Sequence, residues 1–575
     1  MAVDRRSRRL QRRRTRNRAV LAATAAVLVV GGAVAAVTLS GASRTSSRTA
    51  STRPHSPGRS STSTTVHAKT SDVISPTNTK TFLGPDGMEA SWVIAENKLP
   101  GTTAWRITGA PANSTIAGFA NRVEAHAGQT LTFYVSSDAP TFRVEAFRMG
   151  WYQGTGAHLV WTSAELPGHV QPPCPVTSGT NMVACDNWTP SFTVKITSAF
   201  VEGDYLFKLV GSGNQQSYVP LTVWDPAAHA AYLVKNDVFT WQAWNPYGGY
   251  DYYVGQGTCP PVHYPLCSRA RVVSFDRPYG SGAGAGDFLG NELPLVEFAE
   301  EHGLDVAYGT DLLLVQHPSY LSHVTTLLSL GHDECWSYRE RLALDAAHAK
   351  GMNVIFFAAS PILRHVRLQA SPLGPDREEV DYRNALKDPL YGHGNPLRVT
   401  GNTWASPPAS WPETSLVGEM YNGFLEPGQT APFVVHDAVP WLFAGTGLHD
   451  GSSIPGVIAS DFDQFDPSWP HPANVQILGH SPIPLTRAQA SLDNFNGVSY
   501  SDMTYWTDPT SGAGVFDSGT NNWINALNPC PAGTSCPAPL VRRITGNLLR
   551  LFGQGPTGHL EPSVANWQTI VPAGS

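Results

Sequence analysis

The hydrophobic positions between residues 79 and 226 follow a short, alternating pattern. Segments rich in β-branched and aromatic residues occur at 130–136, 142–147, 192–196, 205–210 and 218–223, and clusters of Gly, Pro or Asn separate them. Strands of this length with turn residues at regular intervals are typical of a sandwich, and no helical periodicity competes with them. We therefore predict an antiparallel β-sandwich domain at residues 79–226.

After residue 226 the pattern changes to strands that alternate with helices. Apolar strands are expected at 231–234, 271–275, 305–308 and 353–357, and amphipathic helices at 292–302, 320–328 and 337–350. This alternation is typical of βαβ units, in which helices cover both faces of a parallel sheet. The predicted fold class is α/β plus β: the sandwich, followed by a mostly parallel α/β three-layer domain at residues 227–575.

The first 78 residues have a different character. Residues 1–18 carry nine Arg, whereas residues 19–41 carry no charge. An apolar run of this length can cross a bilayer, and the Arg cluster would keep its own end in the cytoplasm. We predict a cytoplasmic Arg-rich segment (1–18), a transmembrane anchor or signal segment (19–41) and a disordered Ser/Thr-rich linker (42–78). The predicted location is the cell membrane, single-pass with the C-terminal body extracytoplasmic, or secreted if the leader is cleaved near residues 33–35.

Charge and cysteine spacing narrow the classes of function. The 575 residues carry a formal net charge of −6, which argues against nucleic acid as a partner because such binders need a basic face. Cys335 is expected to be a buried free thiol, and no spacing fits a four-Cys zinc site. Three close pairs suggest local disulfides in an oxidising compartment: Cys174 with Cys185, Cys259 with Cys267, and Cys530 with Cys536.

Residues that follow the predicted strands are candidates for chemistry, because ligands of parallel sheets bind beyond the carboxyl ends of the strands. His332, Asp333 and Glu334 follow a strand that ends at residue 330. They could bind a metal or share a proton, or they could form a solvated loop. The aromatic-rich loop at 240–253 could wall a pocket, offer phenolate ligands to a metal, or simply pack. No GxSxG, HExxH or P-loop motif occurs, which removes the commonest hydrolase and nucleotide-binding classes.

Several motifs extend over nearly all of the predicted folded region, from about residue 115 to 557. They include FRMGWYQGTGA (147–157), TWQAWNPYGGY (240–250), FDRPY (275–279), GHDECWS (331–337) and NVIFFAAS (353–360). In these motifs the chain resembles the large (β) subunit family of N,N-dimethylformamidase. The resemblance implies a β-sandwich followed by an α/β domain, with one iron(III) ion held by two Tyr and one Glu. Such an ion would act as a Lewis acid on a small amide and activate a water molecule.

The resemblance also implies roles for individual residues. Glu334 matches the carboxylate ligand of the iron, and His332 matches the His beside it. Tyr279 is the candidate for one tyrosinate ligand. The second Tyr is expected where this chain has Trp244, with Tyr247 as a substitute. Because Trp offers no anionic oxygen, the iron would be weakly held or absent.

Other pocket positions depart from the pattern of the family. Ser360 stands where Asn is usual, and Asp461 stands where Glu is usual. Arg383 stands where Lys is expected, and Arg cannot deprotonate to act as a base. Cys335 replaces a Tyr. The candidate catalytic residues are His332, Glu334, Asp461, Ser360 and Arg383.

Two classes of function compete at this point. The first is a membrane-tethered, hydrolase-like protein that cleaves the C–N bond of an amide with metal assistance; an iron-free enzyme that uses Asp461 or His332 is a variant of it. The second is a non-catalytic cell-envelope protein that binds glycan or another envelope component, with the aromatic residues at 149–152 as a platform. The expected partners are a small-molecule amide or an envelope component, the membrane through residues 19–41, and a second copy of the chain in a homo-oligomer.

Overall fold

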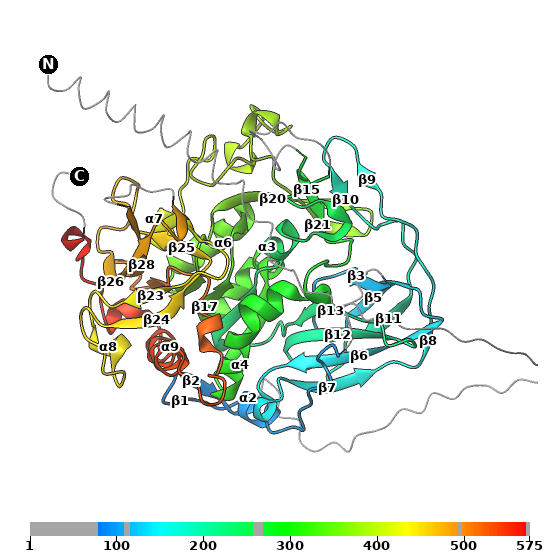
Figure 1. Ribbon diagram of the computed structural model, residues 1–575, viewed down its shortest axis with the longest axis horizontal. Coiled ribbons are helices and arrows are strands. Elements are labelled where there is room, and N and C mark those ends of the chain that lie inside the picture. Colours follow the sequence, from blue (N-terminus) through cyan, green and yellow to red (C-terminus); the bar gives the residue numbers. More distant parts are fainter. Residues whose placement is uncertain (1–78, 109–114, 257–267, 491–496, 571–575) are drawn as a thin grey trace, which may run out of the picture.

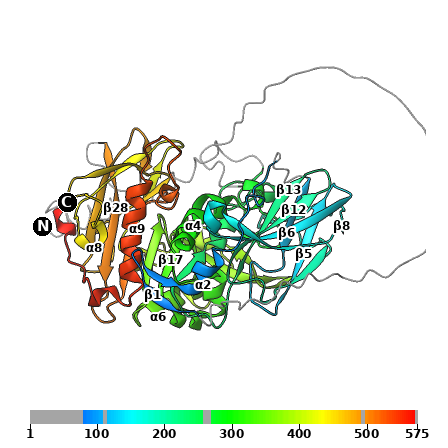
Figure 2. The ribbon, with the colours of Figure 1, turned by 90° about the horizontal axis from the view of Figure 1, so that it is seen from below.

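The computed structural model describes residues 79–108, 115–256, 268–490 and 497–570 (Figure 1). A sandwich occupies one end of the molecule, strands of a parallel sheet lie in the middle, and antiparallel strands from the C-terminal third occupy the opposite end (Figure 1 and Figure 2). The predicted Arg-rich segment, membrane segment and linker lie outside the described residues. The described part is rich in sheets with mixed parallel and antiparallel pairing and contains few helices. This confirms the predicted fold class at a coarse level.

Two sheets and a shared apolar core form the sandwich. Phe133 of one sheet and Val144 and Phe207 of the other lie in this core. Pairing is antiparallel, except that the short strand β4 runs parallel to β13. The first sheet contains β11 (Phe192–Lys195), β5 (Thr130–Ser137) and β3 (Ile116–Ala120). The second contains β4 (Glu124–Ala125), β13 (Gln216–Val223), β12 (Gly203–Gly211), β6 (Thr141–Met149) and β7 (Ala157–Thr162), with β8 (Leu166–Pro167) paired to β6.

Seven strands form the central sheet, in the order β16-β14-β17-β19-β29-β28-β26. The first five run parallel, whereas β28 and β26 are antiparallel to their neighbours. The strands expected at 231–234, 305–308 and 353–357 are confirmed, with ends that differ by up to two residues. The bounds are β14 (Ala230–Asn236), β16 (Val306–Thr310), β17 (Val324–Gly331), β19 (Asn353–Ala358), β26 (Gln476–Pro484), β28 (Val498–Thr507) and β29 (Gly514–Asp517).

Apolar clusters lie on both faces of the central sheet. Along β17, Leu328 and Leu330 belong to the cluster that contains α4 and α9, whereas Leu327 belongs to the cluster that contains α6. This alternation follows from the two-residue period of a strand, and burial of both faces requires the near-continuous apolar runs in the sequence. The helices expected at 292–302 and 337–350 are confirmed. The bounds are α4 (Leu293–Glu301), α5 (Asp311–Gln316), α6 (Tyr338–His348) and α9 (Ala538–Phe552).

Two expected elements differ from the structure. The helix expected at 320–328 is wrong, because a 3₁₀ turn (Pro318–His323) ends there and β17 begins at Val324, where Val and Thr favour a strand. The strand expected at 271–275 exists as β15 (Val272–Ser274), but it does not join the parallel sheet. Instead it pairs with β21 (Gly374–Val380) in a separate sheet that continues through β20 (Arg364–Ser371) to β18 (Cys335–Ser337).

The chain between β19 and β29 forms an extensive insertion. It contains β20 and β21 as well as the two outer strands of the central sheet, β26 and β28. Its remaining strands form two small antiparallel sheets. The insertion brings Arg364 and Asp461 to the edge where the parallel strands end. Its other elements are α7 (Thr414–Val417), β22 (Met420–Leu425), β23 (Ala431–Val434), α8 (Pro440–Phe443), β24 (Ser453–Ile458), β25 (Asp461–Gln464) and β27 (Ala488–Ala490).

The first described residues pack against the α/β part rather than within the sandwich. The Met88 amide donates a hydrogen bond to the Tyr232 hydroxyl of β14 over 3.0 Å. Trp92 joins the apolar cluster around α4, and this cluster also includes Phe147 of the sandwich. The two predicted domains therefore share part of one core. The elements of this segment are β1 (Thr81–Leu83), β2 (Met88–Ala90) and α2 (Ser91–Glu96).

The structure tests the predictions on cysteines and on membrane location. Disulfides join Cys174 to Cys185 and Cys530 to Cys536, and Cys335 is a buried free thiol, as expected. The third predicted pair lies outside the described residues. The predicted single-pass membrane location is corrected: no helix among the described residues is long and apolar enough to cross a bilayer, and the predicted span at 19–41 is not among them.

Candidate functional site

Ionisable residues gather at the carboxyl edge of the parallel strands. Asp237 follows β14, Asp311 follows β16, and His332 begins the loop after β17. Because these strands are parallel, their carboxyl ends meet at one edge of the sheet. The turn after β17 requires glycine: Gly331 has a φ of +50°, and a Cβ atom there would lie 2.4 Å from the carbonyl oxygen of Asn291. This turn directs the loop of residues 332–334 across the edge.

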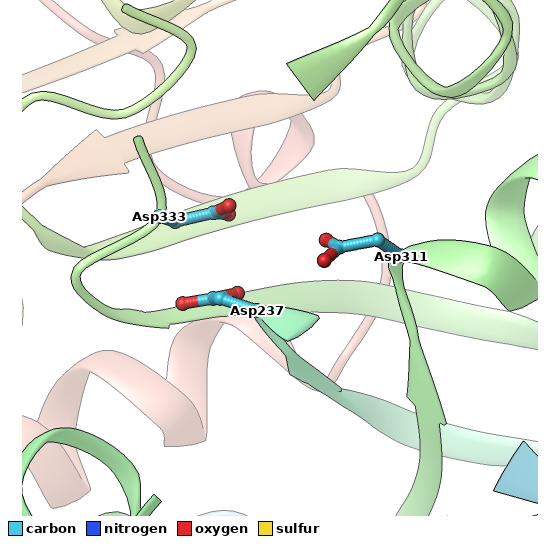
Figure 3. Close-up of side chains that lie close together, drawn as sticks. All are labelled: Asp237, Asp311 and Asp333. Carbon is cyan, nitrogen blue, oxygen red and sulfur yellow. The ribbon is translucent and has the colours of Figure 1, made fainter. Parts of the chain in front are cut away.

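A buried lysine lies at the centre of a group of carboxylates. Figure 3 shows the side chains of Asp237, Asp311 and Asp333 facing one another. Their spacing is that of a metal site, but the Lys235 ammonium fills it: Nζ lies 3.0, 2.5 and 2.8 Å from their oxygens, and 3.6 Å from Glu340. Burial and the neighbouring carboxylates raise the pKa values of Asp237, Asp333 and Glu340. We conclude that this cluster holds an ammonium ion and shared protons.

Glu334 accepts hydrogen bonds on both of its oxygens. The Arg364 guanidinium donates from Nε to Oε1 over 2.9 Å. The Trp244 indole donates to Oε2 over 3.0 Å, and the Tyr253 hydroxyl donates to the same oxygen. Burial would raise the pKa of Glu334, but the charges of Arg364 and His332 lower it to about 2. Glu334 is therefore an ionised carboxylate whose charge a guanidinium balances.

His332 lies between two carboxylates from distant parts of the chain. Its Nε2 atom is 3.8 Å from Glu334 Oε2 and 3.9 Å from Asp461 Oδ2. The Ser360 hydroxyl donates to Asp461 Oδ2 over 3.3 Å. Burial and the nearby Glu334 charge raise the pKa of Asp461 to about 6, although His332 opposes them. A carboxyl group that titrates near neutral pH beside an imidazole is suited to proton transfer.

Tyr253 is a residue of this site that the sequence analysis did not single out. Its ring stacks on Trp244 with 3.6 Å between centroids, and the Arg383 guanidinium lies over it at 4.2 Å. Arg383 also donates from Nε to Asp381 over 3.3 Å. The sequence signal was the aromatic loop at 240–253, whose last residue is Tyr253. The structure thus groups the five candidate catalytic residues around Glu334. His332 lies beside Glu334, Asp461 lies beside His332, and Arg383 lies over the Tyr253 ring. Ser360 donates a hydrogen bond to Asp461.

The two Tyr residues expected as iron ligands lie elsewhere. Tyr247 packs against the cluster of Phe119 and Trp188 on the side of the sandwich. Tyr279 lies edge-on to Trp241, 6.0 Å away, and burial raises the pKa of its hydroxyl well above the ordinary value. No described contact joins either Tyr to Glu334. Tyr279 follows β15, which is not part of the parallel sheet, so its hydroxyl does not share the strand-end edge with Glu334.

Two surface cavities lie away from these groups. One, of about 530 Å³, is lined in part by His471 and Trp506, and the other, of about 330 Å³, by Arg367 and Tyr382. Neither contains a residue of the His332 site. Carboxyl groups with perturbed pKa values and convergent polar contacts gather at the strand ends instead, and such groups are candidates for a functional site.

A comparison with known families agrees with this architecture. A family model described as "N,N-dimethylformamidase beta subunit-like, C-terminal" matches residues 143–536, which is more than half of the chain. The chain belongs to this family. None of the curated proteins matches it. The matched region begins within β6 of the sandwich and includes the whole carboxyl edge of the parallel sheet.

The donors in this member of the N,N-dimethylformamidase beta subunit-like family do not fit a ferric ion. Such an ion needs several hard, anionic oxygen ligands with free lone pairs. Here Trp244 supplies an N–H donor, both oxygens of Glu334 already accept hydrogen bonds, and Tyr247 packs on the sandwich side. Among the described residues, Tyr253 is the one phenol that donates a hydrogen bond to Glu334, so a single tyrosine and a single carboxylate would have to hold the ion. Arg364 and Arg383 add positive charge next to Glu334. We derive no chemical step through iron.

Left-handed backbone conformations also mark this site. Ser360 has a φ of +57°, Ser460 has a φ of +57°, and Arg383 has a φ of +52°. Non-glycine residues in this region are strained, and such strain clusters at functional sites. Asn tolerates the conformation better than Ser does, which gives a physical reason for the Asn that the family usually has at position 360. The Ser360 amide compensates by donating to both oxygens of Asp463 over 2.8 and 2.9 Å.

Proposed function

We propose that this chain is a hydrolase-like member of its family that cleaves the C–N bond of a small amide by acid–base chemistry. One observation carries the proposal: His332 lies within 4 Å of two carboxylates, Glu334 at 3.8 Å and Asp461 at 3.9 Å, at the carboxyl edge of the parallel sheet. An imidazole between a low-pKa and a raised-pKa carboxyl group can pass a proton between water and a leaving amine.

Each group has a defined role in this chemistry. Asp461, with a pKa of about 6, accepts a proton from water through His332 as the water oxygen adds to the carbonyl carbon. The same proton returns to nitrogen as the C–N bond breaks and the amine leaves. The positive charges of Arg364 and Arg383 stabilise the oxyanion that forms in between. Glu334 keeps Arg364 and His332 in place and takes no proton, because its pKa is about 2.

Burial of the site favours a small substrate. The side chains of His332 and Asp461 are 16% and 15% exposed, and Arg364 and Glu334 are 12% and 4% exposed. Groups that are this deeply placed favour a small amide over a polymer. In the aromatic platform that would favour glycan binding, Tyr152 is fully buried and its hydroxyl donates to Glu96 over 2.7 Å, so Tyr152 offers no ring face to a sugar.

The test uses the full chain with formamide, N,N-dimethylformamide and N-methylacetamide, and measures released amine. We expect turnover that falls by about a hundredfold or more in His332→Gln and in Asp461→Asn. His317→Gln, an exposed histidine next to Trp224, is the matched control and should act like the wild type. Binding of amides without release of amine in any buffer would overturn the proposal and favour a non-catalytic binding role.

A further inference from the structure

We infer that Arg364 takes the place of a metal ion at Glu334, so that this member of an iron-enzyme-like family binds no ferric iron there. The inference does not depend on the proposed hydrolysis, because metal content is measured without a substrate. It rests on which atoms contact Glu334 and on how firmly those atoms are held.

The contacts of Arg364 fix it in position. Its backbone amide donates to the Glu334 carbonyl oxygen over 2.7 Å, because β18 and β20 pair with Cys335 opposite Arg364. Its Nη1 atom donates to the Asn402 carbonyl oxygen over 2.7 Å and to the Asn402 side chain over 3.3 Å. A guanidinium held at both ends cannot swing aside to admit an ion at Glu334 Oε1.

The other oxygen of Glu334 is closed by aromatic residues. The Trp244 indole N–H points at Oε2 over 3.0 Å, and Trp has no atom that can bind a metal. Tyr253 stacks on Trp244 and donates its own proton to the same oxygen. An ion at Oε2 would have to displace the Trp244 N–H and remove the Tyr253 proton, and it would gain only one phenolate ligand.

The charge around the carboxylate also opposes a trivalent cation. Arg364 pairs with Glu334, and Arg383 lies over the Tyr253 ring. Arg364 pairs with Glu334 and Arg383 pairs with Asp381, so these four groups leave no net negative charge for an ion. Another carboxylate, Asp461, lies 3.9 Å from His332 Nε2, which lies 3.8 Å from Glu334. A guanidinium is a permanent cation, so it supplies positive charge to the site at every pH.

The first experiment measures iron in the wild-type full chain. The protein is purified after growth in iron-rich medium and again after incubation with ferric citrate, and both samples are examined by elemental analysis and visible absorption. We expect iron far below one ion per chain and no tyrosinate-to-iron band. About one iron per chain, with a visible band that disappears in Glu334→Gln, would overturn the inference.

The second experiment asks whether ferric ion binds once the side chains of Trp244 and Arg364 no longer contact the oxygens of Glu334. The double variant Trp244→Tyr with Arg364→Leu provides a second phenol beside Tyr253 and frees Oε1, and it should bind ferric ion at least about tenfold more tightly than the wild type. Arg367→Leu, which removes a neighbouring arginine of β20 that pairs with Asp388, is the control and should not gain iron. A folded double variant, judged by circular dichroism, that gains no iron would contradict the role given to Arg364.

Discussion

The Lys235 ammonium lies 2.8 Å from the Asp333 carboxylate, and neither side chain has any exposed area. Asp333 stands between His332 and Glu334 in the chain, so this buried ion pair holds the centre of the loop on which both site residues depend. The Ser329 hydroxyl adds a hydrogen bond of 2.7 Å to the same carboxylate. The buried Lys235 ammonium therefore fixes the position of the loop that carries His332 and Glu334.

Replacement of Lys235 should be strongly destabilising. Lys235→Met leaves four buried carboxyl groups without a cation, and the loss of one partner of a buried pair costs about 3–5 kcal/mol. Adding Asp333→Asn should recover part of this loss, because one negative charge is removed with the positive one. Urea unfolding of the single and double variants measures both effects. Lys208→Met is the control, because the buried Lys208 ammonium donates only to backbone carbonyl oxygens, and it should cost less.

Glu334 should stabilise the fold above its ordinary pKa and lose this effect in acid. Its pKa is lowered from 4.5 to about 2, which corresponds to about 3 kcal/mol at neutral pH. The contribution is complete above about pH 4.5 and disappears as the pH falls toward 2. The free energy of unfolding of the wild type should therefore drop in acid by about 3 kcal/mol more than that of Glu334→Gln. Parallel pH profiles of the two proteins would refute this assignment.

The contribution of Asp461 to the free energy of unfolding should depend on pH in the opposite direction. Its pKa is raised from 3.8 to about 6, so the folded state holds a proton that the unfolded state has lost. Stability should then fall by about 3 kcal/mol as the pH rises from about 4 to above 6. Asp461→Asn cannot ionise and should lack this decline. Thermal melts of both proteins at several pH values provide the measurement, and an equal decline in the variant would show that other carboxyl groups cause it.

The two described disulfides should differ in their effect on stability. Cys174–Cys185 closes a separation of 11 residues and Cys530–Cys536 a separation of 6, so loop entropy predicts losses of about 3 and about 2 kcal/mol when each is replaced by two Ser. Cys185 is also fully buried among aromatic residues, which should increase the first loss. Urea unfolding of both double variants tests the order. A larger loss for the Cys530–Cys536 variant would contradict it.

Much of the fold could be predicted because the signals are local. The strand period at 130–136 and the helical period at 337–350 depend on neighbouring residues, and Ser337 with Glu340 forms the capping box that starts α6. The helix expected at 320–328 failed because strand pairing of β17 on both sides outweighed a weak helical pattern. β15 was misplaced because its partner, β21, lies about a hundred residues further along the chain.

The candidate site was only partly predictable. His332 and Glu334 share one loop, so the sequence alone brings them together. Lys235 was not predicted, because the strand expected at 231–234 ended before it. Arg364 left no signal in the sequence, and Tyr253 left only that of its aromatic loop, because the role of both residues depends on which segments meet at Glu334.

The sequence by itself determined the alternation of strands and helices, the local cysteine pairing and the place of the His332 loop at a strand end. Only the tertiary structure decided what Glu334 contacts. Trp244, Tyr253 and Arg364 come from a helix end, a loop and a strand of another sheet, and their hydrogen bonds to Glu334 form only if packing sets the distances to within a few tenths of an ångström. Local periodicity carries no information at that precision, so the pairing of Arg364 with Glu334 becomes visible only in the folded chain.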